Sequence, residues 1–167
     1  HKLIKDNLNR HDISLIHGEA FIKDAHTVRI TSASGEKEIH GDVILVATGS
    51  SPLHPSGIPF DGDLIFDSDT ILHMKRIPKT MAVVGGGVGG TEYASIFAAL
   101  DVNVILIEPK ERLLPSVDTE MIHRLIEQLK IMGLKFALGE KIMEIELRGN
   151  HVQLRLETLG VLDVDIA

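Results

Sequence analysis

A glycine-rich stretch near the middle of the chain has the residue spacing with the clearest chemical meaning. Gly85, Gly87 and Gly90 match the pattern G-x-G-x-x-G. A buried strand is predicted before it, at residues 80–84, and a helix after it, at residues 88–100. A loop in this position presents free backbone N–H groups and the positive end of the helix dipole to a dinucleotide's pyrophosphate. The candidate binding residues are Gly85, Gly86, Gly87, Val88, Gly89 and Gly90.

Each glycine of the pattern has a predicted role. Gly85 permits the tight turn, and Gly87 lets the backbone approach a phosphate because no Cβ intervenes. Gly90 allows the helix to pack closely on the strand. A glycine-rich turn without a ligand remains the alternative, although the strand, the helix and a downstream acid are all in place.

Charged residues near the loop indicate how the rest of the cofactor is recognised. Glu108 ends the second predicted strand, 18 residues after Gly90. Its carboxylate is predicted to accept hydrogen bonds from the adenosine ribose and to repel a 2′-phosphate; the alternative is a solvated acid at a strand end. Lys110 and Arg112 either neutralise a 2′-phosphate or are exposed loop cations, so NAD and NADP both stay open. Glu92, predicted in the first helical turn, either complements the dipole or helps to hold the nicotinamide half.

The elements around the loop predict an α/β fold. Apolar strands at residues 80–84, 103–107 and 135–138 alternate with helices at 88–100 and 118–132, which is the pattern of a Rossmann-like parallel sheet covered on both faces. Asp118 is the candidate N-cap of the second helix, Glu120 lies in its first turn and Gly133 follows its end. Three antiparallel strands, a β-meander, are predicted at residues 141–148, 151–158 and 161–166.

The first part of the chain is predicted to be β-rich. A helix end is followed by strands at 14–17, 27–30, 38–40 and 43–47, with a turn at Ser34-Gly35. Prolines and glycines then interrupt regular structure at residues 50–62, which we interpret as a connection between two units. Because there is no start Met and the first residues read as the end of a helix, we expect a fragment of a longer protein.

Composition excludes several classes of function. With 44% hydrophobic and 25% charged residues, the chain resembles an ordinary globular protein, and its net charge of −7 gives no basic surface for nucleic acid. No apolar run reaches the roughly 18 to 20 residues of a membrane span. The nine histidines lack metal-ligand spacing, and the absence of cysteine excludes disulfides and favours the cytoplasm. The serines lack a G-x-S-x-G setting and no Lys follows Gly90, which disfavours hydrolases and nucleoside triphosphatases.

Taken together, these motifs resemble the pyridine nucleotide-disulfide oxidoreductase family of flavoproteins. Residues 43–52 (VILVATGSSP) are similar to the segment that ends in Ala-Thr-Gly beside the flavin, which implies that Thr48 and Gly49 contact FAD. Residues 83–92 (VVGGGVGGTE) resemble the nicotinamide-nucleotide loop, and residues 112–120 resemble the stretch after the second strand. The resemblance implies that residues 1–62 are the C-terminal part of an FAD domain with its connection, and that 63–167 are an NAD(P)-binding domain.

Within the family, residues 67–72 and 92–97 are most similar to the transhydrogenases, which pass a hydride between NADPH and NAD through FAD. Two positions depart from the pattern: Gly89 replaces a bulky aliphatic residue, and Glu108-Pro109-Lys110 resembles NAD-preferring members. A dihydrolipoamide dehydrogenase-type enzyme and a non-catalytic nucleotide-sensing module remain alternatives. The resemblance implies a homodimer when the protein is complete. The fragment itself is expected to bind nucleotide without turnover, and no catalytic residue is assigned within it.

Overall fold

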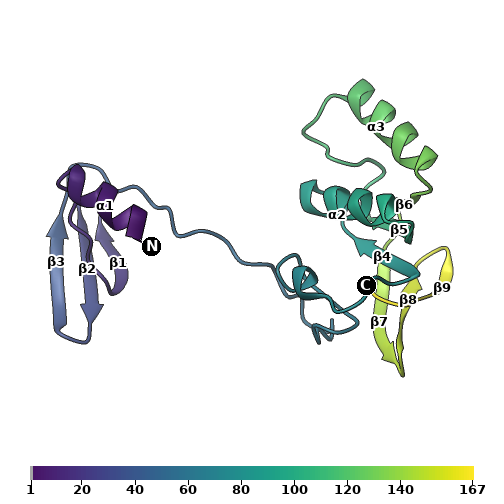
Figure 1. The fold of residues 1–167 in the computed structure, drawn as a ribbon, viewed down its shortest axis with the longest axis horizontal. Coiled ribbons are helices and arrows are strands. Elements are labelled where there is room, and N and C mark those ends of the chain that lie inside the picture. Colours follow the sequence, from purple (N-terminus) through teal and green to yellow (C-terminus); the bar gives the residue numbers. More distant parts are fainter. Residues whose placement is uncertain (1) are drawn as a thin grey trace. The chain divides into compact units, whose positions relative to one another are not determined.

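A computed structural model describes residues 2–167, which form two compact units, one ending at Ser50 and the other spanning Ser51–Ala167 (Figure 1). The division of the chain between a flavin domain and a nucleotide domain remains a prediction.

The N-terminal unit is one helix and a three-stranded antiparallel sheet. Helix α1 spans Lys2–Arg10, and the strands are β1 (Glu19–Asp24), β2 (Thr27–Ser32) and β3 (Gly35–His40), in the order β1-β2-β3. The predicted turn at Ser34-Gly35 is confirmed, because Ser32 pairs with Gly35 across it.

Two strand predictions in this unit are wrong. Residues 14–17 are not a strand; the partner of β2 is instead β1, joined to it by a turn in which the Asp24 side chain accepts a hydrogen bond from the His26 N–H. Residues 43–47 have apolar strand character but no pairing among residues 2–167, and Val43 and Leu45 are 85% and 88% exposed. An unpaired strand leaves its backbone groups unsatisfied, so apolar sequence alone does not produce one.

The C-terminal unit has the predicted Rossmann-like core. Strands β4 (Thr80–Val84), β5 (Asn103–Glu108) and β6 (Lys135–Leu138) are parallel and adjacent in that order. Helices α2 (Val88–Ala99) and α3 (Thr119–Ile131) connect them, and a short 3-10 helix, η1, spans Thr70–His73. The Asp118 side chain accepts hydrogen bonds from the N–H groups of Glu120 and Met121, which confirms the predicted N-cap of α3.

The predicted β-meander follows as strands β7 (Ile142–Arg148), β8 (His151–Leu156) and β9 (Gly160–Val164). In Figure 1 α2 and α3 lie on one side of the parallel sheet and the meander lies on the other. The two sheets share one apolar core, whose most deeply buried side chains are Val104, Leu106, Ile107, Leu113, Val152 and Leu154. Burial of the central strand on both faces fixes β5, and with it the loops at the carboxyl ends of β4 and β5.

The last residues of the unit return to the parallel sheet. Ile166 forms a parallel bridge with Met81 and accepts a hydrogen bond from the Ala82 N–H. The Asp165 carboxylate accepts hydrogen bonds from the N–H groups of Lys79 and Thr80, at 2.7 and 2.9 Å. These contacts fix the start of β4, the strand that leads into the glycine loop.

Candidate functional site

The glycine loop lies between a buried strand and a helix, as the sequence predicts. β4 ends at Val84 and α2 begins at Val88, with Gly87 as its N-cap. The Gly87 carbonyl accepts the first helical hydrogen bond, from the Thr91 N–H, at 3.0 Å. Gly85 has a φ of +105°, a backbone conformation that favours glycine, which confirms its role in the turn.

Two further glycines are required by packing inside the chain. A Cβ on Gly90 would lie 1.9 Å from the Gly85 carbonyl oxygen, so only glycine allows the first turn of α2 to approach the loop. A Cβ on Gly86 would lie 2.4 Å from the Leu113 side chain and 3.1 Å from that of Glu108. The structure therefore confirms that Gly90 allows close packing at the start of α2. It also shows that residue 86 must be small, which the spacing pattern does not reveal.

Gly87 and Gly89 differ from Gly85, Gly86 and Gly90, because neither is required by the turn or by packing within the chain. A Cβ on either residue would have no atom of the chain within 4 Å, and neither has a positive φ. Both are exposed at the N-terminus of α2, whose first N–H groups have no acceptor within the helix. Nothing in the described chain therefore requires glycine at these two positions.

Glu108 is the last residue of β5 and is directly bonded to the loop. Its Oε2 accepts a hydrogen bond from the Gly86 N–H at 2.6 Å, and its Oε1 accepts one from the Lys110 N–H at 3.0 Å. The residue is only 8% exposed. The strand-end position was predicted, whereas the bond to Gly86 was not, because sequence spacing does not show which backbone groups a side chain reaches.

The two nearby cations have different surroundings. Lys110 is exposed, whereas Arg112 is half-buried and its Nη2 donates to the Val117 carbonyl. The Arg112 Nε is buried without a hydrogen-bond partner among residues 2–167. Arg112 therefore stabilises the segment after β5. The Lys110 side chain, by contrast, is exposed to solvent.

Glu92 is the fifth residue of α2 and so lies just past the first turn in which it was predicted. Because the helix begins at Val88, its first turn contains no acid, and Glu92 lies in the second turn with its side chain exposed. The helix dipole acts mainly within the first turn, so the dipole interpretation of Glu92 loses its basis. Contact with the nicotinamide half remains a prediction.

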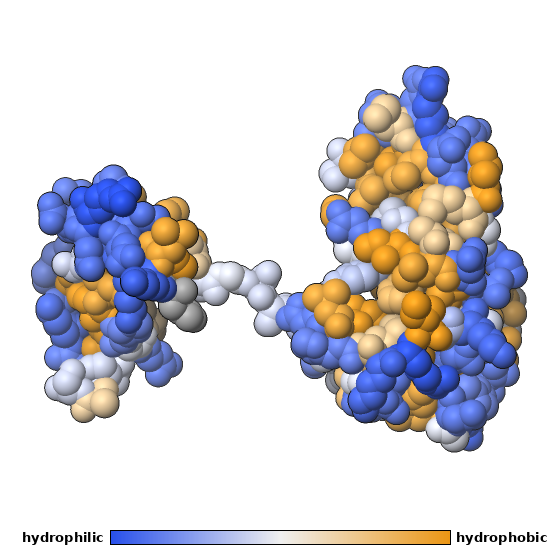
Figure 2. Space-filling view, in the orientation of Figure 1, coloured by the Kyte–Doolittle hydropathy of each residue, from blue (hydrophilic) through white to orange (hydrophobic). Residues whose placement is uncertain are grey.

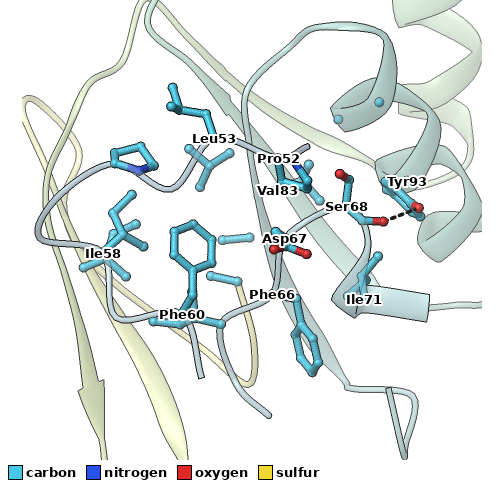
Figure 3. Close-up of a pocket in the computed structure, with 18 of the residues that line it drawn as sticks. Pro52, Leu53, Ile58, Phe60, Phe66, Asp67, Ser68, Ile71, Val83 and Tyr93 are labelled. Atoms are coloured by element: carbon cyan, nitrogen blue, oxygen red, sulfur yellow. Dashed lines mark hydrogen bonds between the residues drawn. The ribbon is translucent and has the colours of Figure 1, made fainter. Parts of the chain in front are cut away.

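An apolar cavity of about 370 Å³ adjoins the loop on its β4 side (Figure 3). Gly89 and Gly90 contribute to its lining, as does Tyr93, whose hydroxyl donates to the Ser68 carbonyl at 2.8 Å. Its lining also includes Pro52, Leu53, Pro55, Ile58, Phe60 and Asp67. Sequence reasoning missed this cavity, because its walls come from segments far apart in the chain.

Thr48 and Gly49 belong to the N-terminal unit. Both are exposed, and Gly49 has a φ of +76°. They follow the unpaired apolar segment 43–47. Their assignment to an FAD site remains a prediction.

Two other features bear on function. Within residues 2–167 no three histidine, aspartate or glutamate side chains cluster as metal ligands. No helix in that range is long and apolar enough to cross a membrane. Apolar side chains do reach the surface of both units, as Figure 2 shows.

Comparison with known proteins places this geometry in a family. The family model described as pyridine nucleotide-disulphide oxidoreductase matches residues 1–167. A soluble pyridine nucleotide transhydrogenase from Photobacterium profundum is 40% identical over 90% of this chain and 32% of its own length. The one from Colwellia psychrerythraea is 41% identical over 90% and 32%. The chain thus spans about a third of the length of these relatives.

Solved structures agree with the fold. LpdA from Mycobacterium tuberculosis has a TM-score of 0.80 at 26% identity, covering 99% of this chain and 38% of that one. The HOCl-induced flavoprotein disulfide reductase RclA from Escherichia coli has a TM-score of 0.72 at 28% identity, covering 98% and 38%. Sequence and fold together show that the chain belongs to the pyridine nucleotide-disulphide oxidoreductase family.

Proposed function

We propose that residues 85–90 bind the pyrophosphate of a nicotinamide dinucleotide, and that this chain is the nucleotide-binding part of an FAD-dependent oxidoreductase. The observation that carries the proposal is the open backbone at Gly87, the N-cap of α2. A phosphate there would accept hydrogen bonds from the first N–H groups of the helix and would be stabilised by its dipole. Membership of a family that binds nicotinamide dinucleotides supports it.

The adenosine ribose would lie beside Glu108. The carboxylate is held by the N–H groups of Gly86 and Lys110, and each of its oxygens retains a lone pair for a ribose hydroxyl. A buried anion at this point disfavours a 2′-phosphate, while exposed Lys110 favours one. Because Arg112 is bonded to Val117, Lys110 would be the residue that accommodates NADP.

In the complete protein we expect hydride transfer between NADPH and NAD through FAD, as in the transhydrogenases that this chain resembles. The flavin would supply the redox chemistry, and the residues of this chain would bind the dinucleotide and orient its nicotinamide ring. Thr48 and Gly49 would contact FAD once the rest of its domain is present. We also propose that the complete protein is a homodimer and lies in the cytoplasm.

A second candidate is an NAD-linked dehydrogenase of the dihydrolipoamide dehydrogenase type. The hydrogen bond that holds Glu108 beside the loop favours it, because a fixed anion at the ribose suits NAD better than NADP. Such an enzyme needs a redox-active cysteine pair, which would have to lie outside these 167 residues. The nucleotide preference of the chain would separate the two candidates.

The test is a calorimetric titration of the chain with NADH and with NADPH. Comparable affinities for the two nucleotides support the transhydrogenase, and binding of NADH alone supports the NAD-linked dehydrogenase. Gly87→Val should abolish binding of both, because its side chain occupies the space of the phosphates. Gly41→Ala is the control, since its Cβ would make only an ordinary contact, 3.5 Å from the Val43 carbonyl. A folded chain that binds neither nucleotide would contradict the proposal.

A further inference from the structure

Glu140 is a buried acid between the end of β6 and the start of β7, and the binding of a dinucleotide at the glycine loop does not use it. The residue is only 3% exposed. Charged side chains are rarely buried to this extent unless they are paired. The hydrogen bonds around Glu140 therefore indicate why a carboxylate is kept inside the unit at this point.

The partner of the Glu140 side chain is Thr158, in the turn that joins β8 to β9. The Thr158 N–H donates to Oε1 at 2.8 Å, and the Thr158 hydroxyl donates to Oε2. These bonds, led by that of the hydroxyl, lower the pKa of the Glu140 carboxyl, so the residue is an anion at neutral pH. The backbone adds a further link, because the Glu157 N–H donates to the Lys141 carbonyl at 2.9 Å. The turn is therefore bonded to residues 140–141.

The backbone of residues 139 and 140 is bonded in turn to the end of β5. The Glu140 N–H donates to the Glu108 carbonyl at 3.2 Å. The Gly139 N–H donates to the Lys110 carbonyl at 3.0 Å. Residues 139 and 140 thus hold the backbone at Glu108 and just after it. The Glu108 carboxylate, held by the N–H groups of Gly86 and Lys110, is the group that we propose binds the adenosine ribose.

A side chain that binds a ligand keeps its geometry when hydrogen bonds fix the groups behind it. Loss of the Glu140 carboxylate would leave the N–H and hydroxyl of Thr158 without their acceptor and would free residues 139–140 from the turn. The bond between residues 157 and 141 and the pairing of β7, β8 and β9 would remain. The expected result is a less fixed backbone around Glu108 in a chain that still folds.

We propose that Glu140 is a positioning residue for nucleotide selection: by bonding to Thr158 it holds the backbone at Glu108, and so fixes the anion that distinguishes a ribose 2′-hydroxyl from a 2′-phosphate. This inference rests on the proposed function, since it needs the adenosine ribose at Glu108. It predicts that loss of Glu140 changes the preference between NADH and NADPH, although the carboxylate of Glu140 is itself occupied by Thr158.

The experiment measures the affinities of the full chain for NADH and NADPH by calorimetry. Glu140→Ala should lower the ratio of NADH to NADPH affinity about threefold, because a less fixed Glu108 binds the ribose less well and repels a 2′-phosphate less. Glu140→Gln should restore the parent ratio, since its amide can accept from the Thr158 N–H and donate to the hydroxyl. Asp118→Ala is the control: it removes the N-cap of α3 and leaves Glu140 and Thr158 in place.

A second set of variants shows whether the effect passes through Glu108. In Glu108→Gln the selecting charge is absent, so the addition of Glu140→Ala should leave the ratio of that variant unchanged. Thr158→Val removes the hydroxyl but keeps the N–H, and should lower the ratio of the parent by a smaller factor than Glu140→Ala. If Glu140→Ala does not fold, Thr158→Val takes its place in both comparisons.

The outcomes separate this inference from the one beneath it. If the parent chain binds neither nucleotide, the nucleotide-binding proposal fails and this inference fails with it. If the parent binds NADH alone, its NADH affinity replaces the ratio in each comparison. An unchanged value in Glu140→Ala, or the same fall in the Glu108→Gln background, overturns this inference and leaves the nucleotide-binding proposal standing. A fall that Glu140→Gln restores and Glu108→Gln abolishes supports it, because general loss of stability would weaken both nucleotides alike.

Discussion

Glu108 and Gly86 are joined by a hydrogen bond of 2.6 Å, in which the backbone N–H of the second glycine donates to the carboxylate at the end of the neighbouring strand. The bond connects the parts of the site predicted to bind the pyrophosphate and the ribose. Since the Leu114 N–H also donates to the Gly86 carbonyl, at 3.1 Å, both backbone groups of Gly86 are used. The loop is therefore held in shape by the segment that follows β5.

Neutralising Glu108 should change nucleotide preference. In Glu108→Gln the amide keeps an oxygen that can accept from Gly86 but no longer repels a 2′-phosphate, so the ratio of NADH to NADPH affinity should fall about tenfold. Calorimetric titrations with both nucleotides measure this ratio. Glu127→Gln, an exposed position on α3, should leave it unchanged. An unaltered ratio in Glu108→Gln would show that its charge does not select the nucleotide.

Alanine at two adjacent glycines of α2 should have opposite effects on stability. Gly90→Ala places a Cβ 1.9 Å from the Gly85 carbonyl and should destabilise the chain by about 1–3 kcal/mol. Gly89→Ala meets no atom within 4 Å and should stabilise it by about 0.5–1 kcal/mol, because alanine favours the helix. Urea unfolding of both variants measures the difference. Equal stabilities would contradict the close approach of α2 to the loop.

The N-cap of α3 offers an independent check of the fold. Asp118→Ala removes the acceptor for the Glu120 and Met121 N–H groups and should cost about 1 kcal/mol. For a chain of this size that corresponds to a melting temperature lower by about 2–4 °C. Asp118→Asn retains a capping oxygen and should melt close to the parent. If both variants lose the same amount, the negative charge matters more than the cap.

Asp165 should make stability depend on acid pH. Hydrogen bonds from the backbone, led by that from the Thr80 N–H, lower the pKa of its carboxyl in the folded chain. The resulting stabilisation is fully present above the unfolded pKa of about 3.9 and is lost as the pH falls through the folded value. Asp165→Asn should therefore unfold at lower urea than the parent at pH 7, with the gap narrowing below about pH 4. Asp69→Asn, at an exposed position whose side chain makes no cap hydrogen bond, is the control.

Local patterns were sufficient where the decisive contacts are local. The strand–glycine–helix unit at residues 80–99 and the N-cap at Asp118 were predicted because their signals lie within a few residues of one another. The burial of Val104, Leu106 and Ile107 in β5 follows from the apolar run at residues 104–107. These elements position the glycine loop, so the loop could be located between β4 and α2 from the sequence alone.

Contacts between residues far apart in the chain could not be predicted from the sequence. Whether residues 14–17, 19–24 or 43–47 form strands depends on which segment finds a partner. Of these three segments, only 19–24 pairs with β2 in the part of the chain that the structure describes. The hydrogen bond between Glu108 and Gly86 joins residues 22 positions apart in the sequence. The walls of the cavity come from residues 52–60, from β4 and from α2. Such features arise from tertiary packing, which spacing and periodicity do not encode.

Backbone amide spectra of the isotope-labelled chain during titration with NADH test the central claim most directly. We predict saturable shifts of the Gly87, Val88 and Gly89 resonances, with smaller changes at Gly86 and Lys110, whose N–H groups are bonded to Glu108. The meander β7–β9 should remain unchanged. Saturable shifts elsewhere with none in residues 85–90, or no shifts at all in the folded chain, would contradict the assignment of this loop as the dinucleotide site.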